Sequence, residues 1–271
     1  MAITTRDGLI DALANNSSRV VIDKASLANA AAGQYFSLWT ATGVPGAGSA
    51  PGAAANPTSA TTGAMGFANQ TAPATSYIAW LSTLAGNSAT NLEIHDRLAH
   101  MGGLSGTVTT SQGALSLVTN SPGAGRLGDA NYSDVQWWLE VYTALGATGV
   151  NATVAVEYDD ASTGNLAAIA LGATPRQGRL YPCVSASAGK FIRAVTGVTL
   201  SATTGTAGNF GITATRPRTM VSMPLLNKAE TYDWAQLGFP NVPNDSCLMM
   251  LMYCSTTSTG TVRGQGKLAH G

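Results

Sequence analysis

A two-residue period in side-chain character runs through residues 135–158 and constrains the fold more than any other feature of the sequence. This period is typical of β-strands with one buried face. Residues 145–149, Leu-Gly-Ala-Thr-Gly, interrupt it with turn-forming residues. The sequence therefore predicts two strands joined as a β-hairpin. Their apolar sets are Val135, Trp137, Leu139 and Val141 in the first strand, and Ala152, Val154, Val156 and Tyr158 in the second.

Four further runs have strand composition and are bounded by Gly, Pro, Thr or Ser; they are residues 191–201, 210–215, 247–254 and 260–267. No long amphipathic helices separate them, and no internal repeat is present. We therefore predict an all-β fold with a β-sandwich or jelly-roll-like core. Residues 248–253 are apolar without alternation, which predicts a strand buried on both faces, in the core or at a subunit contact.

Residues 76–84 and 91–98 are predicted to be two more strands, joined across residues 85–88, with Ile78, Trp80 and Leu84 on one face. A helix is the alternative for the second segment. Thr90 and Glu93 have the spacing of a capping box, and the glycine pair at 102–103 would end such a helix.

The first segment with a helical period covers residues 5–15, where Leu9, Ile10 and Leu13 share a face and Thr5 is a candidate N-cap. Two interpretations of this helix stay open. It is either docked on its own domain or an arm laid on a neighbouring subunit. Its three apolar residues are candidate interface residues.

Small residues dominate a predicted loop at residues 41–73. Disorder and close contact with an adjacent surface are both consistent with this composition. Trp39 before the loop, and Pro45 and Pro51 within it, are further interface candidates. We expect an N-terminal arm and loop region at residues 1–75 and a β-sandwich at 76–271, or one continuous domain; two small lobes are also compatible with the length.

Trp137 and Trp138 are adjacent, so a strand places them on opposite faces. At least one of the two indoles must then be buried by something other than the core on one face of its own sheet. A second sheet or loop provides that cover in one interpretation, and a subunit interface in the other, because aromatic residues are enriched at interfaces. Both tryptophans are therefore interface candidates.

The charge balance is unusual: 14 Lys and Arg against 14 Asp and Glu give a net charge of zero, and charged residues make up only 10% of the chain. About 25% is typical of soluble domains. Near-zero charge favours self-association and disfavours nucleic acid or anionic membranes as partners. No apolar run is long enough for a membrane span.

Cysteine usage and the first residues indicate where the chain is made. The three cysteines, Cys183, Cys247 and Cys254, are an odd number, and we interpret them as buried free thiols. The N-terminal residues do not have the pattern of a secretory signal, so we expect cytoplasmic assembly.

The motifs that carry chemistry are weak. Residues 123–128 fit Gly-x-Gly-x-x-Gly, but neither a strand nor a helix is predicted beside them, so we interpret them as a loop. No nucleophile elbow is present. His95 and His100 are five residues apart, which does not suit a shared metal. Asp96 and Arg97 are interpreted as ion-pair or cross-strand partners. We expect no enzymatic activity, no cofactor and no metal.

Several stretches carry a resemblance to virion proteins of tailed bacteriophages. They are residues 5–13 (Thr-Arg-Asp-Gly-Leu-Ile-Asp-Ala-Leu), the 36–43 and 51–54 segments, 95–98 (His-Asp-Arg-Leu), 132–140 (Tyr-Ser-Asp-Val-Gln-Trp-Trp-Leu-Glu) and 208–213 (Gly-Asn-Phe-Gly-Ile-Thr). The chain most resembles capsid decoration, or cement, proteins. The resemblance implies a jelly-roll-like core, a homotrimer, and binding to the major capsid protein or other virion proteins on the outer face of the head.

Other roles remain alternatives. A tail, collar or fibre component is compatible with the same features. A major capsid subunit is disfavoured because no segment sustains a long helical period. A carbohydrate-binding module would need exposed aromatic residues and carboxylates in a groove, and the carboxylates of this sequence are scattered.

Overall fold

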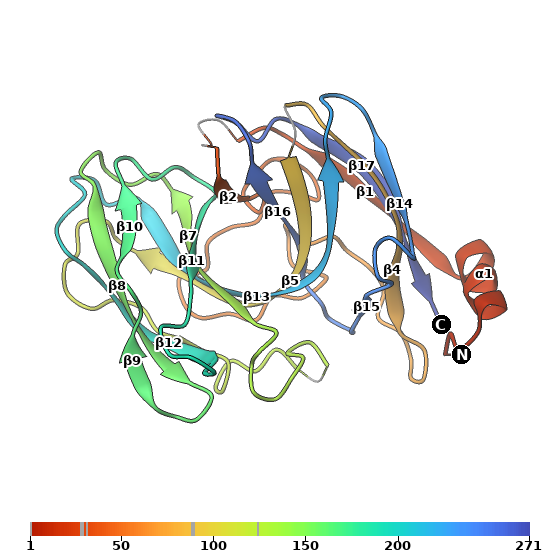
Figure 1. Cartoon of the computed structure of the whole chain (residues 1–271), viewed down its shortest axis with the longest axis horizontal. Coiled ribbons are helices and arrows are strands. Elements are labelled where there is room, and N and C mark those ends of the chain that lie inside the picture. Colours follow the sequence, from red (N-terminus) through yellow and green to blue (C-terminus); the bar gives the residue numbers. More distant parts are fainter. Residues whose placement is uncertain (1, 28–29, 31, 88–89, 124) are drawn as a thin grey trace. The chain divides into compact units, whose positions relative to one another are not determined.

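The computed structural model describes residues 2–27, 30, 32–87, 90–123 and 125–271. Within them the chain is nearly all β, as predicted, with one short helix, α1 (Arg6–Asn15), near the N-terminus (Figure 1). No helix in the described ranges is long and apolar enough to cross a membrane. The strands are β1 (Ser17–Lys24), β2 (Gln34–Ser37), β3 (Gly43–Val44), β4 (Ser76–Ala85), β5 (Thr90–Leu104), β6 (Leu115–Ser116), β7 (Gln136–Thr143), β8 (Val150–Tyr158), β9 (Thr163–Asn165), β10 (Ile169–Gly172), β11 (Arg179–Cys183), β12 (Ile192–Leu200), β13 (Asn209–Met223), β14 (Glu230–Asp233), β15 (Asn241–Val242), β16 (Leu248–Cys254) and β17 (Val262–His270).

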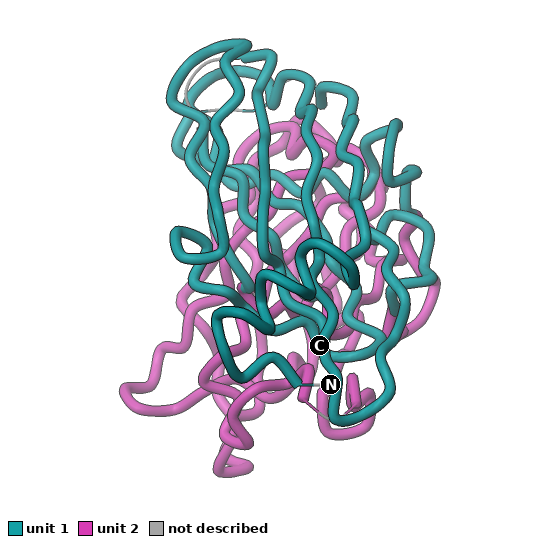
Figure 2. The backbone as a smooth tube through the Cα atoms, turned by 90° about the vertical axis from the view of Figure 1, so that its right-hand side faces the viewer, with its two compact units in different colours: residues 1–48, 58–96, 218–271 teal, residues 49–57, 97–217 magenta. Residues whose placement is uncertain are grey.

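Two compact units make up the chain (Figure 2). Unit 1 comprises residues 1–48, 58–96 and 218–271, and unit 2 comprises residues 49–57 and 97–217. This division differs from the boundary expected near residue 75, because the N-terminal strands pair with the C-terminal ones. The chain passes between the units after residues 48 and 57, within β5 and within β13.

Unit 1 is a sandwich built from both ends of the chain and from residues 58–96. Its larger sheet has the order β14-β4-β17-β1-β3, with β15 also paired to β4. The other sheet pairs β16 with β2 and with the first part of β5. One apolar cluster contains residues of both sheets, including Ile22 and Ile78 from the first and Phe36, Ile94 and Met250 from the second. Of the apolar run at residues 248–253, Leu248 to Met252 are buried, as predicted, whereas Tyr253 is 39% exposed.

Unit 2 is a second sandwich with its own core. One sheet has the order β10-β8-β12-β6, with β9 also paired to β8. In the other, β7 pairs with β11 and β13. The apolar cluster between them joins Val154 and Val198 of the first sheet to Leu139 and Ile212 of the second. The alternation in β8 has the expected consequence, because Val154, Val156 and Tyr158 are buried while Asn151 and Thr153 are exposed.

The predicted hairpin of residues 135–158 is wrong in its pairing, although both strands exist. β7 pairs with β11 and β13, whereas β8 pairs with β9, β10 and β12 in the other sheet. The connection between them is anchored elsewhere. Leu145 N donates to Pro175 O (3.1 Å) and Gly146 N to Thr204 Oγ1 (3.1 Å). These hydrogen bonds hold the connection in place where the chain crosses from one sheet of the sandwich to the other.

Residues 76–84 and 91–98 are strands, as predicted, and the helical alternative for the second is wrong. They belong to different ladders, β4 with β17 and β5 with β16. Ile78 and Trp80 do not share a face, because a register shift between Lys267 and Leu268 inserts an extra residue, Ala79, in β4. Such a β-bulge reverses the phase of the alternation. Ile78 therefore lies in the core, while Trp80 is only half-buried.

Candidate functional site

Helix α1 docks on its own unit through one face. Thr5 caps it, with Oγ1 accepting from Gly8 N at 3.0 Å. Leu9 is buried in a small cluster with Ala12, Ala79 and Ala269, and Leu13 packs against that cluster half-buried. Ile10, on the outer side of the helix, is 58% exposed. Of the three interface candidates in this helix, only Ile10 presents most of its surface.

The small-residue loop is packed and not disordered. The indole of Trp39 is buried, and Gly48 and Gly63 approach it so closely that a Cβ at either would overlap it, at 2.7 Å from Cδ2 and 2.8 Å from Cε3 respectively. Gly48 N also donates to Trp39 O at 2.8 Å. Trp39 as an interface residue is therefore a wrong prediction: the loop that follows it covers its ring.

The two loop prolines lie in different units. Pro45 is half-buried in unit 1, next to Val44, which is 48% exposed. Pro51 is half-buried in unit 2, and its carbonyl accepts from Gly102 N at 2.8 Å. Both prolines stay predictions as interface residues.

Trp137 and Trp138 are both covered by the chain itself, which corrects their assignment to an interface. Trp137 lies in the core of unit 2, and its Nε1 donates to Ile192 O at 2.8 Å. Trp138 is on the other face of β7, where its Nε1 donates to Thr215 Oγ1 at 2.9 Å. Both tryptophans are 4% exposed or less. The chain itself therefore buries both indoles, and no subunit interface is needed to do so.

A buried polar cluster occupies unit 2. The Arg97 guanidinium donates to Glu140 Oε1 (2.8 Å) and to the Tyr142 hydroxyl (3.1 Å), and Thr213 Oγ1 donates to Glu140 Oε2 (2.6 Å). His100 Nδ1 is 2.7 Å from Arg97 Nη1. Because a guanidinium only donates, His100 Nδ1 accepts this hydrogen bond and the imidazole is neutral. Burial, and then the charge of Arg97, lower the pKa of His100 to about 2. All five side chains are buried, so the cluster has a structural role.

Asp96 and Arg97 both form ion pairs with residues of other strands, and not with one another. Asp96 Oδ2 accepts from Arg218 Nη2 at 3.1 Å, and its Oδ1 accepts from Cys247 N at 2.8 Å. His95, also buried, lies 2.9 Å from Glu93 Oε2. The two neighbouring histidines, His95 and His100, thus have different partners.

Potential metal and thiol chemistry is limited. Within the described ranges, no group of three or more His, Cys, Asp or Glu side chains is arranged to hold a metal ion. All three cysteines are free and buried, which confirms the prediction. Burial raises the pKa of Cys183 to about 12, so this thiol is not nucleophilic at neutral pH.

The glycine motif at 123–128 belongs to an irregular segment, as predicted, although residue 124 lies outside the described residues. Its arginine, Arg126, is buried. The guanidinium donates to Arg97 O (2.8 Å) and Pro57 O (3.1 Å), which binds the segment to its own unit. The motif therefore positions an internal arginine.

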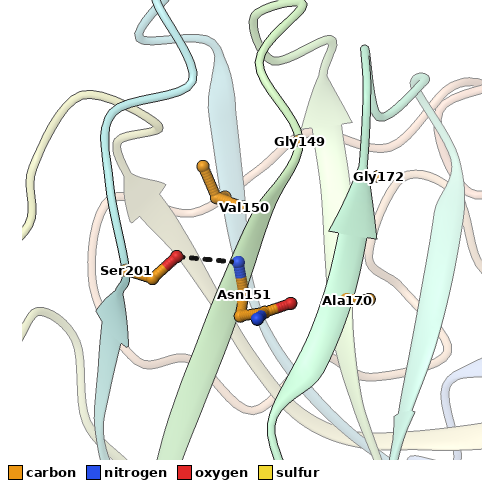
Figure 3. Close-up of a pocket in the computed structure, with 6 residues that line it drawn as sticks. All are labelled: Gly149, Val150, Asn151, Ala170, Gly172 and Ser201. Carbon is orange, nitrogen blue, oxygen red and sulfur yellow. Dashed lines mark hydrogen bonds between the residues drawn. The ribbon is translucent and has the colours of Figure 1, made fainter.

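Two depressions show contrasting chemistry. The one in Figure 3, about 270 Å³ in volume, lies in unit 2 at β8 and β10. It is lined by Gly149, Val150, Asn151, Ala170, Gly172 and Ser201, none of which carries a charge. Ser201 Oγ accepts from Asn151 N at 3.0 Å, as the dashed line in Figure 3 marks, so the hydroxyl is part of the local structure.

The second depression, about 320 Å³, lies beside α1 in unit 1, and we call it the α1 pocket. Its lining residues are Leu13, Ala79, Trp80, Asp233, Trp234 and Lys267. The strands that form its floor, β4, β14 and β17, lie next to α1 in Figure 1. Of the two, only this pocket combines aromatic rings with charged groups.

Three of these residues form a row across the outer face of the larger sheet of unit 1. Trp80 of β4 is paired with Asp233 of β14 on one side and with Lys267 of β17 on the other. Directly opposed residues of antiparallel strands point to the same face. The indole of Trp80 is therefore flanked by a carboxylate and an ammonium. The site is not evident from the sequence, because the two-residue period groups Trp80 with Ile78 on one face, whereas the bulge at Ala79 separates them.

Comparisons with known proteins do not identify a family for this chain. No protein family matches the sequence, and no curated protein does. Among solved structures, the chain is similar to the VP2 subviral particle of infectious bursal disease virus, at 11% identity, with 93% of this chain and 79% of that chain covered and a TM-score of 0.17. T=1 particles derived from infectious bursal virus give 10% identity, coverage of 94% and 76%, and a TM-score of 0.18. Scores this low establish neither a shared fold nor a shared function.

Proposed function

We propose that this chain is a structural protein of a tailed-bacteriophage virion, which binds the outer surface of the capsid as a decoration protein. The observation that carries the proposal is the exposure of large apolar side chains on a chain with very few charges. Leu225 and Leu226, adjacent in the turn after β13, are 54% and 55% exposed, and Ile10 is 58% exposed. With charged residues at 10%, such surface is best stabilised by contact with another protein.

The two sandwiches support this role by providing rigid scaffolds. Each has its own apolar core, and the strands are held by antiparallel ladders. Loops and termini on such a scaffold are the parts that meet partners. The resemblance at residues 5–13 and 95–98, among others, adds the expectation of a homotrimer on a head shell.

We infer in addition that the chain is not an enzyme. Two buried ion pairs, Arg97 with Glu140 and Arg218 with Asp96, use their charged groups internally. The neutral His100 is enclosed beside Arg97. A general base requires access to a substrate proton, and enclosure denies that access. The proposed partners are other copies of the chain and capsid proteins, and the proposed location is the virion, after assembly in the host cytoplasm.

We propose that the contact with the capsid is made by the N-terminal segment, residues 3–15, and by the loop at residues 41–73. Ile10 and Val44 are large apolar side chains of these segments that are exposed, at 58% and 48%. Since neither is charged, the binding should depend on shape and apolar contact, repeated over several subunits, and it should change little with salt.

Co-sedimentation with heads assembled without the chain tests this assignment. The variants Ile10→Ser and Val44→Ser should fold normally, because both side chains are exposed, and the double variant should lose occupancy on the heads. Val118→Ser, at a 52% exposed position in unit 2, is the matched control and should bind as the wild type does. Wild-type occupancy of the double variant would locate the contact elsewhere. Failure of the wild type itself to bind heads would contradict the decoration role.

A further inference from the structure

The α1 pocket has the features of a ligand site that the proposed structural role does not require. Its volume of about 320 Å³ is at the lower end of the range of about 300–1,000 Å³ typical of small-molecule sites. Two tryptophans line it, and the ring of Trp234 is 39% exposed and so accessible to a ligand. The charged pair on either side of Trp80 adds polar groups at the rim.

The exposed indole is held in place before any ligand arrives. Trp234 begins a tight turn in which Asp233 Oδ1 accepts from Ala235 N and Gln236 N, both at 3.0 Å. Phe239 N donates to Trp234 O at 2.9 Å, and the two rings meet edge to face with centroids 6.4 Å apart. Phe239 in turn stacks on Tyr77 of β4, with centroids 4.4 Å apart. A fixed ring loses little entropy on binding, which favours affinity.

The charges at the rim select against ionic ligands. Asp233 and Lys267 lie on opposite flanks of Trp80, so their charges offset one another within the pocket. Asp233 retains a second oxygen, Oδ2, outside the turn that Oδ1 caps. Lys267 Nζ donates to Leu13 O at 3.2 Å and has two further protons. The rim thus offers both an acceptor and a donor to a neutral ligand.

We propose that the α1 pocket binds a neutral pyranose ring of a glycan. A pyranose has an apolar C–H face, which matches the negative face of an indole, and a hydroxyl edge that both donates and accepts hydrogen bonds. Trp80 and Trp234 provide the aromatic surfaces, while Asp233 and Lys267 are placed to meet the hydroxyls. A quaternary ammonium group also suits aromatic rings, but it has no hydroxyl edge and so cannot use both the acceptor and the donor at the rim.

Saturation-transfer-difference NMR tests the proposal on the full chain, with D-glucose, D-galactose, N-acetylglucosamine and N-acetylmannosamine as separate probes and choline as the cationic comparison. We expect saturation of the ring C–H protons of at least one sugar, with a Kd on the order of 1 mM. Trp234→Ala should weaken that binding at least tenfold. Asp233→Asn keeps the Oδ1 acceptor that caps the turn, so it should fold and should weaken binding by a smaller factor.

The matched control is Tyr253→Ala, which removes an aromatic ring with the same 39% exposure elsewhere in unit 1 and should leave sugar binding unchanged. The proposal would be overturned by no transfer to any of the four sugars, by stronger transfer to choline than to every sugar, or by equal loss in Tyr253→Ala and Trp234→Ala. Dimerisation that Trp234→Ala abolishes would also overturn it, because a second copy would then fill the pocket. Since head binding is measured separately, the two proposals can fail independently.

Discussion

Substitution of Gly48 by alanine tests whether the small-residue loop is an integral cover of the unit 1 core. A Cβ at this position would lie 2.7 Å from Cδ2 of Trp39, well inside van der Waals contact. Trp39 cannot withdraw easily, because Gly63 approaches the same indole and would also overlap it with a Cβ. Overpacking of this kind costs roughly 1–3 kcal/mol of the free energy of unfolding.

Gly52→Ala is the matched control in the same loop. No atom lies within 4 Å of the position that its Cβ would occupy, and its φ is outside the left-handed region. Such a change reduces the freedom of the unfolded chain and raises stability by about 0.4–1 kcal/mol where the backbone is compatible. The two substitutions are chemically identical, so their opposite signs would isolate the contact with Trp39.

Thermal and urea unfolding, followed by tryptophan fluorescence, provide the assay. Gly48→Ala should lower the midpoint of the transition by a few degrees, on the scale of about 2–4 °C per kcal/mol for a chain of this size. Gly52→Ala should leave it unchanged or raise it slightly. If both variants unfold at the wild-type midpoint, the loop does not press on Trp39 and the packing argument is wrong.

Three further predictions concern buried groups. Because the pKa of His100 is depressed in the folded protein, the unfolded chain binds a proton at this imidazole more readily than the folded chain does. The free energy of unfolding should therefore fall by about 2 kcal/mol as the pH is lowered from about 7 to about 5. In urea titrations, His100→Asn should largely remove this loss. Glu140→Gln should lower the free energy of unfolding by about 3–5 kcal/mol, because it leaves the charge of the buried Arg97 uncompensated. A smaller loss, measured by urea unfolding, would mean that the ion pair contributes little to stability. Ellman's reagent should not modify any cysteine before unfolding; rapid labelling of Cys183 in the native protein would contradict its burial.

Local patterns in the sequence were sufficient to predict most elements, but not how they pair. The two-residue period located β7 and β8, and Thr5 located the start of α1. The short connection from Leu145 to Gly149 looked like a hairpin turn, yet its backbone groups bond to residues 175 and 204, far along the chain. No local signal reports such partners, so the arrangement of two sandwiches could not be derived from the pattern.

The missed elements have clearer causes. β1 alternates at Val20, Ile22 and Lys24, and the buried lysine disguises the pattern. Lys24 is tolerated because its Nζ donates to Ala41 O (2.9 Å) and Gly46 O (3.3 Å), at the beginning of the loop. The α1 pocket was missed for another reason: it depends on a bulge in β4 and on β14, a short strand with no hydrophobic signal of its own.

Cryo-electron microscopy of virions whose genome encodes this chain tests the central claim most directly. We expect extra density on the outer surface of the head, of a size that accommodates two β-sandwiches per copy, and we expect it to be absent from particles in which the gene is deleted. Density for the chain in the tail, collar or fibres, or identical heads with and without the gene, would contradict the claim that it is a capsid decoration protein.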